Sequence, residues 1–369
     1  MTAGQSIVAN GITKPDDELT LLVDGQVIGG FEDVKVSLRA EGFPNSFTVK
    51  ASMQPGDQLP MQPGDDCVVK LGNDTVITGW VDRLADAGDE EDHLITISGR
   101  GLTEDLVDCG AEWPSHQLIG GNALTIAQRL AQPYNLEVVM GNGASPGADI
   151  SQWALNYGET GAEIIQRVAR NAGLLAYEDN MGRLVLANVG AATAASGIVY
   201  GQNVQAWSVE RTMDQRFSDY VCCMFASDSF GDLAGSDFYH SETDPNVPRH
   251  RLTYLVVDAV ATNPQDFTIQ RAKWEAARRA GRAFVVNATV DSWRDSAGGL
   301  WLPNTLVPVD VPGATGGNML VISEVNFIRN DGRGTIAEVI AMPKAAFQPE
   351  PIVLAPVNTA DIVPAGAAK

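Results

Sequence analysis

Apolar and polar residues alternate along short segments of this chain, from about residue 18 to residue 101. The segment LTLLV at 19–23 runs into an Asp-Gly pair, which is typical of the tight turn of a β-hairpin. The segment VKVSL at 34–38 places its three apolar side chains on one face of a strand. About six short strands at this spacing predict a small β-barrel or β-sandwich.

This β pattern returns in the second half of the chain. Four pieces match in the same order, with gaps of similar length between them. The first two matched pairs are 47–52 (FTVKAS) with 284–289 (FVVNAT) and 63–69 with 303–309. In the third pair, Val76, Ile77 and Val81 match Val321, Ile322 and Val325. In the fourth, 94–97 matches 336–340. One match can arise by chance because strands reuse residue types, but four in order predict a duplicated β module. Two such modules let an oligomer display twice its own symmetry.

The patterns predict a mainly β chain with an α/β insert, divided into five parts. These are an N-terminal arm (1–17), a first β module (18–101), an α/β insert domain (102–189), a second β module (190–343) with a helix at 266–282, and a Pro-rich C-terminal tail (344–369). In the insert, Asn122 and the pair Thr160 and Glu163 are helix-capping residues and predict two helices. Residues 227–251 are polar and predict a loop, and the tail is expected to lack regular structure.

The net charge of −21 argues against several classes of function. Nucleic-acid binding uses Lys and Arg to displace counterions from phosphates, and anionic membranes attract the same residues. The chain opens without a signal peptide, and no segment approaches the roughly 20 apolar residues that span a bilayer. The four cysteines have no metal-ligand spacing. We therefore expect synthesis in the cytoplasm, no membrane contact, and no metal or cofactor.

Sequence motifs for catalysis are missing. Ser115 and His116 are adjacent, but no GxSxG segment surrounds them. The glycine pairs fit neither GxxxxGK[ST] nor GxGxxG, so no phosphate-binding loop is indicated. Pairs of acidic residues lie in polar turns, where solvated carboxylates are expected. The sequence therefore predicts no catalytic residue and no enzyme activity.

Two segments are candidate contacts with a partner. The helix at 266–282 carries five basic residues in a chain that has only 25. Three of them fall near one stripe of the helix: Arg271, Arg278 and Arg282. This stripe is either a solvated face or a surface that pairs with acidic residues of a neighbouring subunit. The Pro-rich tail is already extended and loses little entropy on docking. Its apolar candidates are Ile352, Leu354 and Val357.

Further segments resemble a known family. They are 105–109 (DLVDC), 124–131 (LTIAQRLA), 216–220 (RFSDY) and 300–306 (LWLPNTL). Together they resemble the phage Mu-like baseplate hub proteins, a family similar to the T-even phage tail hub and to the N-terminal part of type VI secretion spike proteins. The resemblance runs from about residue 19 to residue 347, and the WLPN segment at 301–304 is its most specific part.

The resemblance implies a structural protein of a contractile phage tail, located in the baseplate of the virion. It implies a homotrimer with two tube-like β-barrels per chain, whose six barrels form a pseudo-sixfold ring. The partners are then the tail tube protein, the central spike protein and other baseplate proteins, and DNA passes through the ring without specific binding. A tail-associated cell-wall hydrolase, with 102–189 as its active domain, and a carbohydrate-binding tail protein are the alternatives.

Acidic residues on the polar faces of the β modules are candidates for the wall of such a channel. DNA slides past a negative wall because no Lys or Arg contact holds it. Charges act over about 8–10 Å at physiological salt, so these residues have to lie close to the DNA. The candidates are Asp82, Asp86, Asp310 and Glu324. The alternative is that they coat the outside of the ring.

Overall fold

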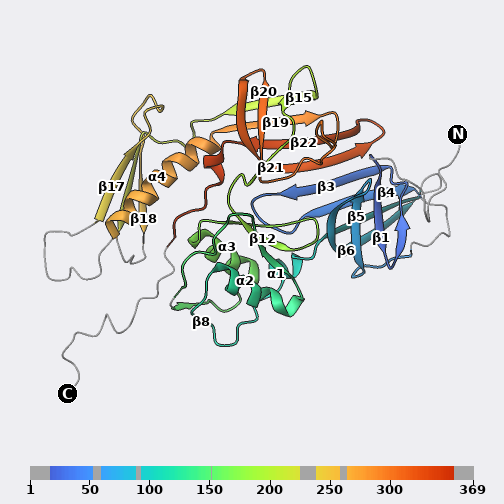
Figure 1. Cartoon of the computed structure of the whole chain (residues 1–369), viewed down its shortest axis with the longest axis horizontal. Coiled ribbons are helices and arrows are strands. Elements are labelled where there is room, and N and C mark those ends of the chain that lie inside the picture. The colour runs from blue at the N-terminus through green and yellow to red at the C-terminus, as the bar shows by residue number, and fades with distance from the viewer. Residues whose placement is uncertain are drawn as a thin grey trace.

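The computed structural model describes residues 17–52, 60–88, 93–150, 152–224, 238–257 and 264–352. Figure 1 shows a first β module (blue), a second β module (orange and red), a mixed domain (green) below their junction, and a projecting arm that contains α4. The chain is mainly β, as the alternation predicted. In the described part of the chain, no helix is both long and apolar enough to cross a membrane.

The first module is a run of antiparallel strands. They are β1 (Leu19–Val23), β2 (Gln26–Ile28), β3 (Asp33–Arg39), β4 (Ser46–Ser52), β5 (Asp66–Leu71), β6 (Asp74–Gly88) and β7 (His93–Gly101). Their spatial order is β3-β4-β7-β6-β5-β1-β2. Val34, Val36 and Leu38 of β3 are buried, which confirms the predicted face.

The second module repeats the core of this arrangement. Its strands are β13 (Ala192–Thr193), β14 (Ile198–Val199), β15 (Val204–Arg211), β19 (Phe284–Val290), β20 (Thr305–Val311), β21 (Ala314–Asn330) and β22 (Gly334–Met342). Their order β15-β19-β22-β21-β20 matches β3-β4-β7-β6-β5 strand for strand. The four pieces matched in the sequence lie in equivalent strands of the two modules, so the repeat is structural.

A β-bulge in β6 and another in β21 show which residues of these two strands are equivalent. The ladder between β6 and β7 shifts between Val81 and Arg83, and the ladder between β21 and β22 shifts between Ile322 and Glu324. The bulged positions are therefore Asp82 and Ser323. Val81 corresponds to Ile322, so the sequence matches of Val81 with Val325 and of Val76 and Ile77 with Val321 and Ile322 were wrong by three and four residues. The ladders to β7 and β22 make Phe47 the equivalent of Val286 and not of Phe284, so the match of 47–52 with 284–289 was wrong by two. Alternation alone does not reveal a bulge, because the extra residue leaves the pattern on both sides intact.

The two modules share one sheet and one core. β3 pairs with β21, which joins them in a sheet of 14 strands. A single hydrophobic cluster spans both and includes Leu21, Ile97, Trp293 and Phe327. Among the described strands, no recorded ladder closes either module on itself, so the two separate barrels expected from the resemblance stay a prediction.

The insert domain packs two amphipathic helices against small sheets. Its elements are α1 (Glu104–Asp108), β8 (Gln117–Ile119), α2 (Ala123–Ala131), η1 (Gln132–Tyr134), β9 (Val138–Met140), β10 (Gln152–Ala154), α3 (Gly161–Asn171), β11 (Leu175–Glu178) and β12 (Leu184–Ala187). Asn122 caps α2 and Thr160 caps α3 through a capping box with Glu163, as predicted. Ile126, Leu130, Ile164 and Val168 build a core separate from that of the β modules.

The arm leaves the second module between β15 and β19. It consists of β16 (Asp219–Met224), β17 (Phe238–Thr243), β18 (Leu252–Val257) and α4 (Pro264–Arg282). The predicted helix at 266–282 is therefore present. The predicted loop at 227–251 was wrong in part, because residues 238–243 form β17 and pair with β16. Residues 227–237 of that loop lie outside the described residues.

The predicted tail begins with regular structure. Residues Lys344–Phe347 form the 3₁₀ helix η2, and Ala346 and Phe347 are fully buried. They pack with Leu175, Val189 and Met342, which joins the insert to the second module. The first residues of the tail therefore belong to the core, contrary to the expectation that it lacks structure.

Candidate functional site: the junctions between the modules and the insert

The first junction joins the two β modules. Residues 34–39 of β3 pair antiparallel with residues 324–329 of β21, and Arg39 lies directly opposite Glu324. Ser37 Oγ donates a buried hydrogen bond of 2.5 Å to Asn326 Oδ1. Asn326 Nδ2 in turn donates to Glu324 Oε1 at 2.9 Å. This polar row fixes the register, because a slip of one residue would turn these side chains to the opposite face.

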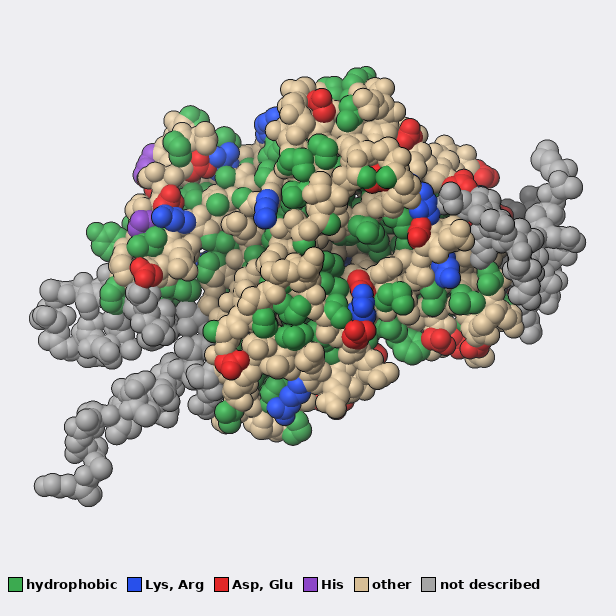
Figure 2. All heavy atoms as spheres, viewed as in Figure 1, with side chains coloured by type: hydrophobic (Ala, Val, Ile, Leu, Met, Phe, Trp, Pro, Cys, Tyr) green, Lys and Arg blue, Asp and Glu red, His purple; other side chains and the backbone are tan. Residues whose placement is uncertain are grey.

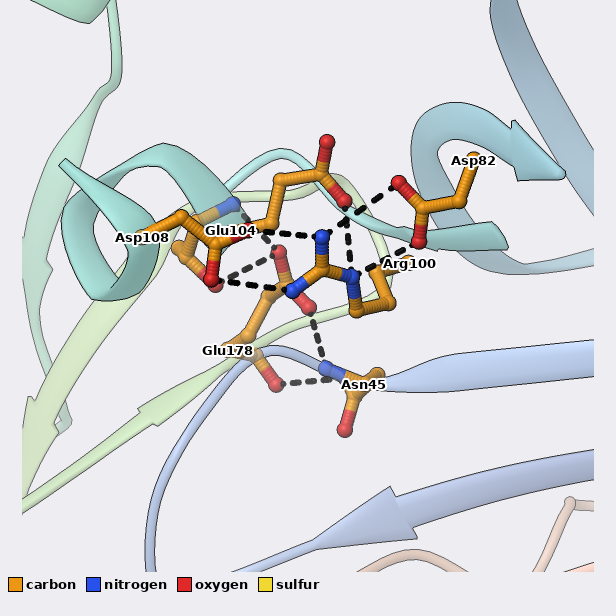
Figure 3. A network of polar contacts seen from close by, with 7 residues as sticks. Asn45, Asp82, Arg100, Glu104, Asp108 and Glu178 are labelled. Atoms are coloured by element: carbon orange, nitrogen blue, oxygen red, sulfur yellow. Dashed lines mark hydrogen bonds and ion pairs between the residues drawn. The ribbon is translucent and has the colours of Figure 1, made fainter. Parts of the chain in front are cut away.

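The second junction joins the insert to the first β module. A buried carboxylate, Glu178, lies at its centre, at the end of β11 (Figure 3). It is 4% exposed and accepts hydrogen bonds from the backbone N–H groups of Asn45 at 2.8 Å and Thr103 at 3.0 Å. Thr103 Oγ1 donates a third bond at 2.9 Å. Burial raises the pKa of Glu178 to about 7, although these hydrogen bonds act in the opposite direction. Glu178 thus ties the insert to the loop between β3 and β4.

Arg100 lies beside Glu178 and is surrounded by carboxylates (Figure 3). Its guanidinium contacts Asp82 and Asp108 at 2.7 Å each and Glu104 at 3.2 Å. The hydrogen bonds to Asp108 and Asp82 raise the pKa of Arg100, so it stays charged. Burial, with the nearby charge of Asp82, raises the pKa of Glu104 to about 8. The cluster therefore ties β6 and β7 of the first module to α1 of the insert.

The WLPN segment connects the insert to the second module. Trp301 is 2% exposed, and its Nε1 donates to the Ser292 carbonyl at 3.2 Å. Asn304 has a φ of 57°, in the left-handed region that asparagine tolerates. Its Oδ1 accepts from the Gly190 N–H at 2.7 Å and its Nδ2 donates to the Asn188 carbonyl at 2.9 Å. The segment therefore fixes the backbone of Asn188 and Gly190, where the chain leaves the insert.

A cavity of about 420 Å³ lies where the insert and both β modules meet. Its charged lining residues already have partners. Asp74 contacts Arg294 at 2.6 Å, and Asp179 contacts Arg183 at 2.7 Å. The third, Glu178, is the buried acceptor described above. The cavity wall thus offers a substrate no free charge, and the described residues contain no group of three or more side chains suited to a metal ion.

The arginines of α4 have partners inside their own chain. Glu41 contacts Arg282 at 2.5 Å and Arg278 at 3.3 Å. Glu350 contacts Arg271 at 2.6 Å. The carbonyl of Gln348 accepts from Arg278 Nη1 at 3.0 Å. The stripe therefore holds the loop after β3 and residues 346–350 against α4, and its contact with another subunit stays a prediction.

Comparisons with known proteins agree with this architecture. Three family models match: Mu phage baseplate assembly protein GpP-like, N-terminal (residues 18–101), baseplate hub protein gp44-like, second domain (103–188), and Mu phage baseplate assembly protein GpP, fourth domain (265–350). The chain is 29% identical over 343 residues to the baseplate hub protein gp44 of Escherichia phage Mu, covering 89% of this chain and 88% of that protein. The chain is a homologue of the phage Mu baseplate hub protein.

Solved structures extend this result. The 43 kDa tail protein of prophage MuSo2 from Shewanella oneidensis matches with a TM-score of 0.81 and 27% identity, over 90% of this chain and 99% of that one. A type VI secretion system component of Escherichia coli shares the fold, with a TM-score of 0.56 and 10% identity over 90% and 80% of the two chains. This hub protein of a Mu-like phage tail thus has the fold of phage tail and type VI secretion proteins, as the resemblance predicted.

The four acidic candidates of the hub protein do not meet in one site. Asp82 contacts Arg100, and Asp86 Oδ1 lies 2.6 Å from His93 Nε2. Asp310 accepts from the Gly316 N–H at 3.2 Å, and Glu324 lies in the first junction. On the face seen in Figure 2, acidic side chains are scattered, with basic ones beside several of them. Whether any of the four lines a channel stays a prediction.

In the tail, Ile352 is half-buried against the core of the insert. Leu354 and Val357 lie outside the described residues. The sequence also missed the residues that hold the junctions: Asn45, Arg100, Thr103, Glu178 and Asn304. Only Asn304 had a signal, because it lies in the WLPN segment.

Proposed function

We propose that three copies of this hub protein form an adaptor between the sixfold tail tube and the threefold central spike, with a channel for DNA. The repeated strand order of the two modules carries this proposal. A trimer of a chain with two equivalent modules presents six similar units to the tube and three complete chains to the spike. One sheet and one core hold both modules, so the two units of each chain keep fixed positions relative to each other.

In this proposal each module is a tube-like barrel, completed where it meets its neighbour in the ring. The proposed parts keep the boundaries 1–17, 18–101, 102–189, 190–343 and 344–369, and the three family matches lie within or close to them. The role is structural and not catalytic. The name of the phage Mu relative supports this role. The cavity where the insert and both β modules meet also supports it, because every charged residue in its wall has an ion-pair or hydrogen-bond partner.

The acidic charge suits a channel for DNA. Each chain carries −21, so a trimer carries a large negative charge that repels the phosphates of passing DNA. We propose that Asp82, Asp86, Asp310 and Glu324 contribute to this charge. The tail tube protein, the central spike protein and other baseplate proteins are the proposed partners, and synthesis takes place in the host cytoplasm.

The purified full chain is expected to be a trimer, with a mass of three times 39.2 kDa by light scattering. Mixed with its own tail tube and central spike proteins, it should bind one spike trimer at one end and tube subunits at the other. Electron microscopy of the mixture measures both contacts. A chain that stays monomeric at micromolar concentration, alone and with these partners, would contradict the adaptor.

Two truncations separate the core of the tail from its partner contacts. Removal of residues 346–369 deletes buried Phe347 and should lower the free energy of unfolding by about 3–5 kcal/mol. Removal of residues 353–369 leaves Phe347 and Ile352 in place, so the trimer should fold normally and bind the spike less tightly. Chemical unfolding and spike binding measure the two effects. Unchanged spike binding by the shorter truncation would show that Leu354 and Val357 make no partner contact.

A further inference from the structure

The strand pairing between the two modules of one chain indicates how modules of neighbouring chains would pair. Within one chain, β3 of the first module pairs with the second half of β21 of the second module. The shared strand order makes β15 the equivalent of β3, and β6 the equivalent of β21. The equivalent junction would therefore join β15 of one module to the second half of β6 of another.

Both of these strands have an uncovered edge in the described chain. Among the described strands, only β19 pairs with β15. The ladder from β6 to β5 ends at Trp80, so residues 83–88 of β6 pair with β7 alone. The two strands lie far apart in the order of the sheet and belong to different modules, so they do not meet within one copy. Unpaired backbone donors and acceptors along both edges are suited to pairing with another chain.

We propose that β15 of one copy pairs antiparallel with residues 83–88 of β6 in the next copy. The inference rests on the proposed trimer and specifies its interface. The contact is heterologous, because two different surfaces meet, and three such contacts close a ring. In this ring each module contacts its neighbour in the same way, whether that neighbour belongs to its own chain or to the next.

The known ladders fix the register. The bulge makes Arg83 the equivalent of Glu324. The ladders through β4 and β19 make Val36 the equivalent of Val209. Inside the chain, Phe327 lies opposite Val36. Between chains, Asp86 then lies opposite Val209.

The remaining pairs follow from the same register. They are Arg83 with Thr212, Leu84 with Arg211, Ala85 with Glu210, Ala87 with Ser208 and Gly88 with Trp207.

Side-chain faces and charges provide two independent checks. Leu84 and Val209 both pack against the shared hydrophobic core, and the register places them on the same face of the combined sheet. A slip of one residue would put them on opposite faces. On the diagonals of the ladder, Arg83 lies near Glu210, and Asp86 lies near Arg211. Both diagonals join opposite charges, as the pair of Arg39 and Glu324 does inside the chain.

Cysteine cross-linking of the full chain tests the pairing. Opposite residues of antiparallel strands have Cα atoms about 4.5–5.5 Å apart, within the range that a disulfide spans. The double variant Ala87→Cys with Ser208→Cys should therefore form covalent trimers under mild oxidation, which reductant reverses. The control Asp86→Cys with Ser208→Cys points its thiols to opposite faces and should not cross-link. Each single variant should also stay uncross-linked, since the four native cysteines lie outside this ladder.

The outcomes separate this inference from the proposed function. A wild-type trimer whose 87–208 variant forms no cross-link would refute the pairing and leave the trimer standing. Cross-links of equal yield in the 86–208 control would refute the register. A wild-type protein that is monomeric would overturn the trimer and the pairing together.

Discussion

Replacement of Trp293 by alanine is expected to lower the free energy of unfolding by about 3–5 kcal/mol, because it leaves a large cavity in the core shared by both modules. Trp293 is 1% exposed, and its ring lies edge-on to Phe327 with centroids 6.3 Å apart. Its Nε1 donates to the carbonyls of Ile328 at 3.2 Å and Ile336 at 3.0 Å. Urea unfolding followed by circular dichroism measures the loss at a fixed protein concentration, since association also affects stability.

Two further variants separate the causes of this effect. Trp293→Phe keeps most of the apolar volume but leaves both carbonyls without their donor, so a smaller loss of about 1–3 kcal/mol is expected. Tyr157→Ala is the matched control, because Tyr157 is 85% exposed and its removal should change stability by less than about 0.5 kcal/mol. A loss below about 1 kcal/mol for Trp293→Ala would mean that Trp293 does not support the shared core.

Local patterns predicted most of the elements of the β modules. Alternation is a local signal, so Val34, Val36 and Leu38 were correctly placed on the buried face of β3. The capping residues of α2 and α3 are equally local. Strand β17 was missed because its sequence, FYHSET, is polar at four of six positions and was interpreted as loop. Its partner β16 decides its conformation, and no pattern within the segment shows that pairing.

The junctions depend on contacts that are distant in the sequence. Glu178 is separated from Asn45 by 133 residues, and Arg282 from Glu41 by 241. A single carboxylate at the end of a strand has no local feature that distinguishes a buried acceptor from a solvated side chain. The sequence left the stripe of arginines on α4 as either a solvated face or a surface that pairs with another subunit. It did not suggest the contacts with Glu41 of the same chain, because the fold that brings Glu41 to the helix was not visible in the sequence.

The change Glu178→Ala is expected to weaken the attachment of the insert to the first module. It removes the acceptor of three hydrogen bonds and leaves the N–H groups of Asn45 and Thr103 buried without partners. Each unsatisfied group costs about 1–3 kcal/mol, so a loss of several kcal/mol in the free energy of unfolding is expected. Glu163→Ala removes a carboxylate of similar size that caps an exposed helix end, and it should cost only about 1 kcal/mol.

The pH dependence of the free energy of unfolding tests whether the pKa of Glu178 is raised in the folded chain. Its pKa is raised to about 7 in the folded chain, whereas the pKa of an unfolded glutamate is about 4.3, so the folded state holds a proton more tightly. Its contribution is therefore complete below about pH 4 and is lost as the pH rises through about 7. The loss is on the order of 3 kcal/mol.

The variant Glu178→Gln is neutral at every pH, so its unfolding free energy should fall less between pH 5 and pH 8 than that of the wild type. Glu104, whose pKa is raised to about 8 by burial, adds a slope of the same sign, and Glu104→Gln should reduce it. Unfolding curves measured at pH 5, 6, 7 and 8 give these slopes, and parallel profiles for Glu178→Gln and the wild type would show that Glu178 titrates normally.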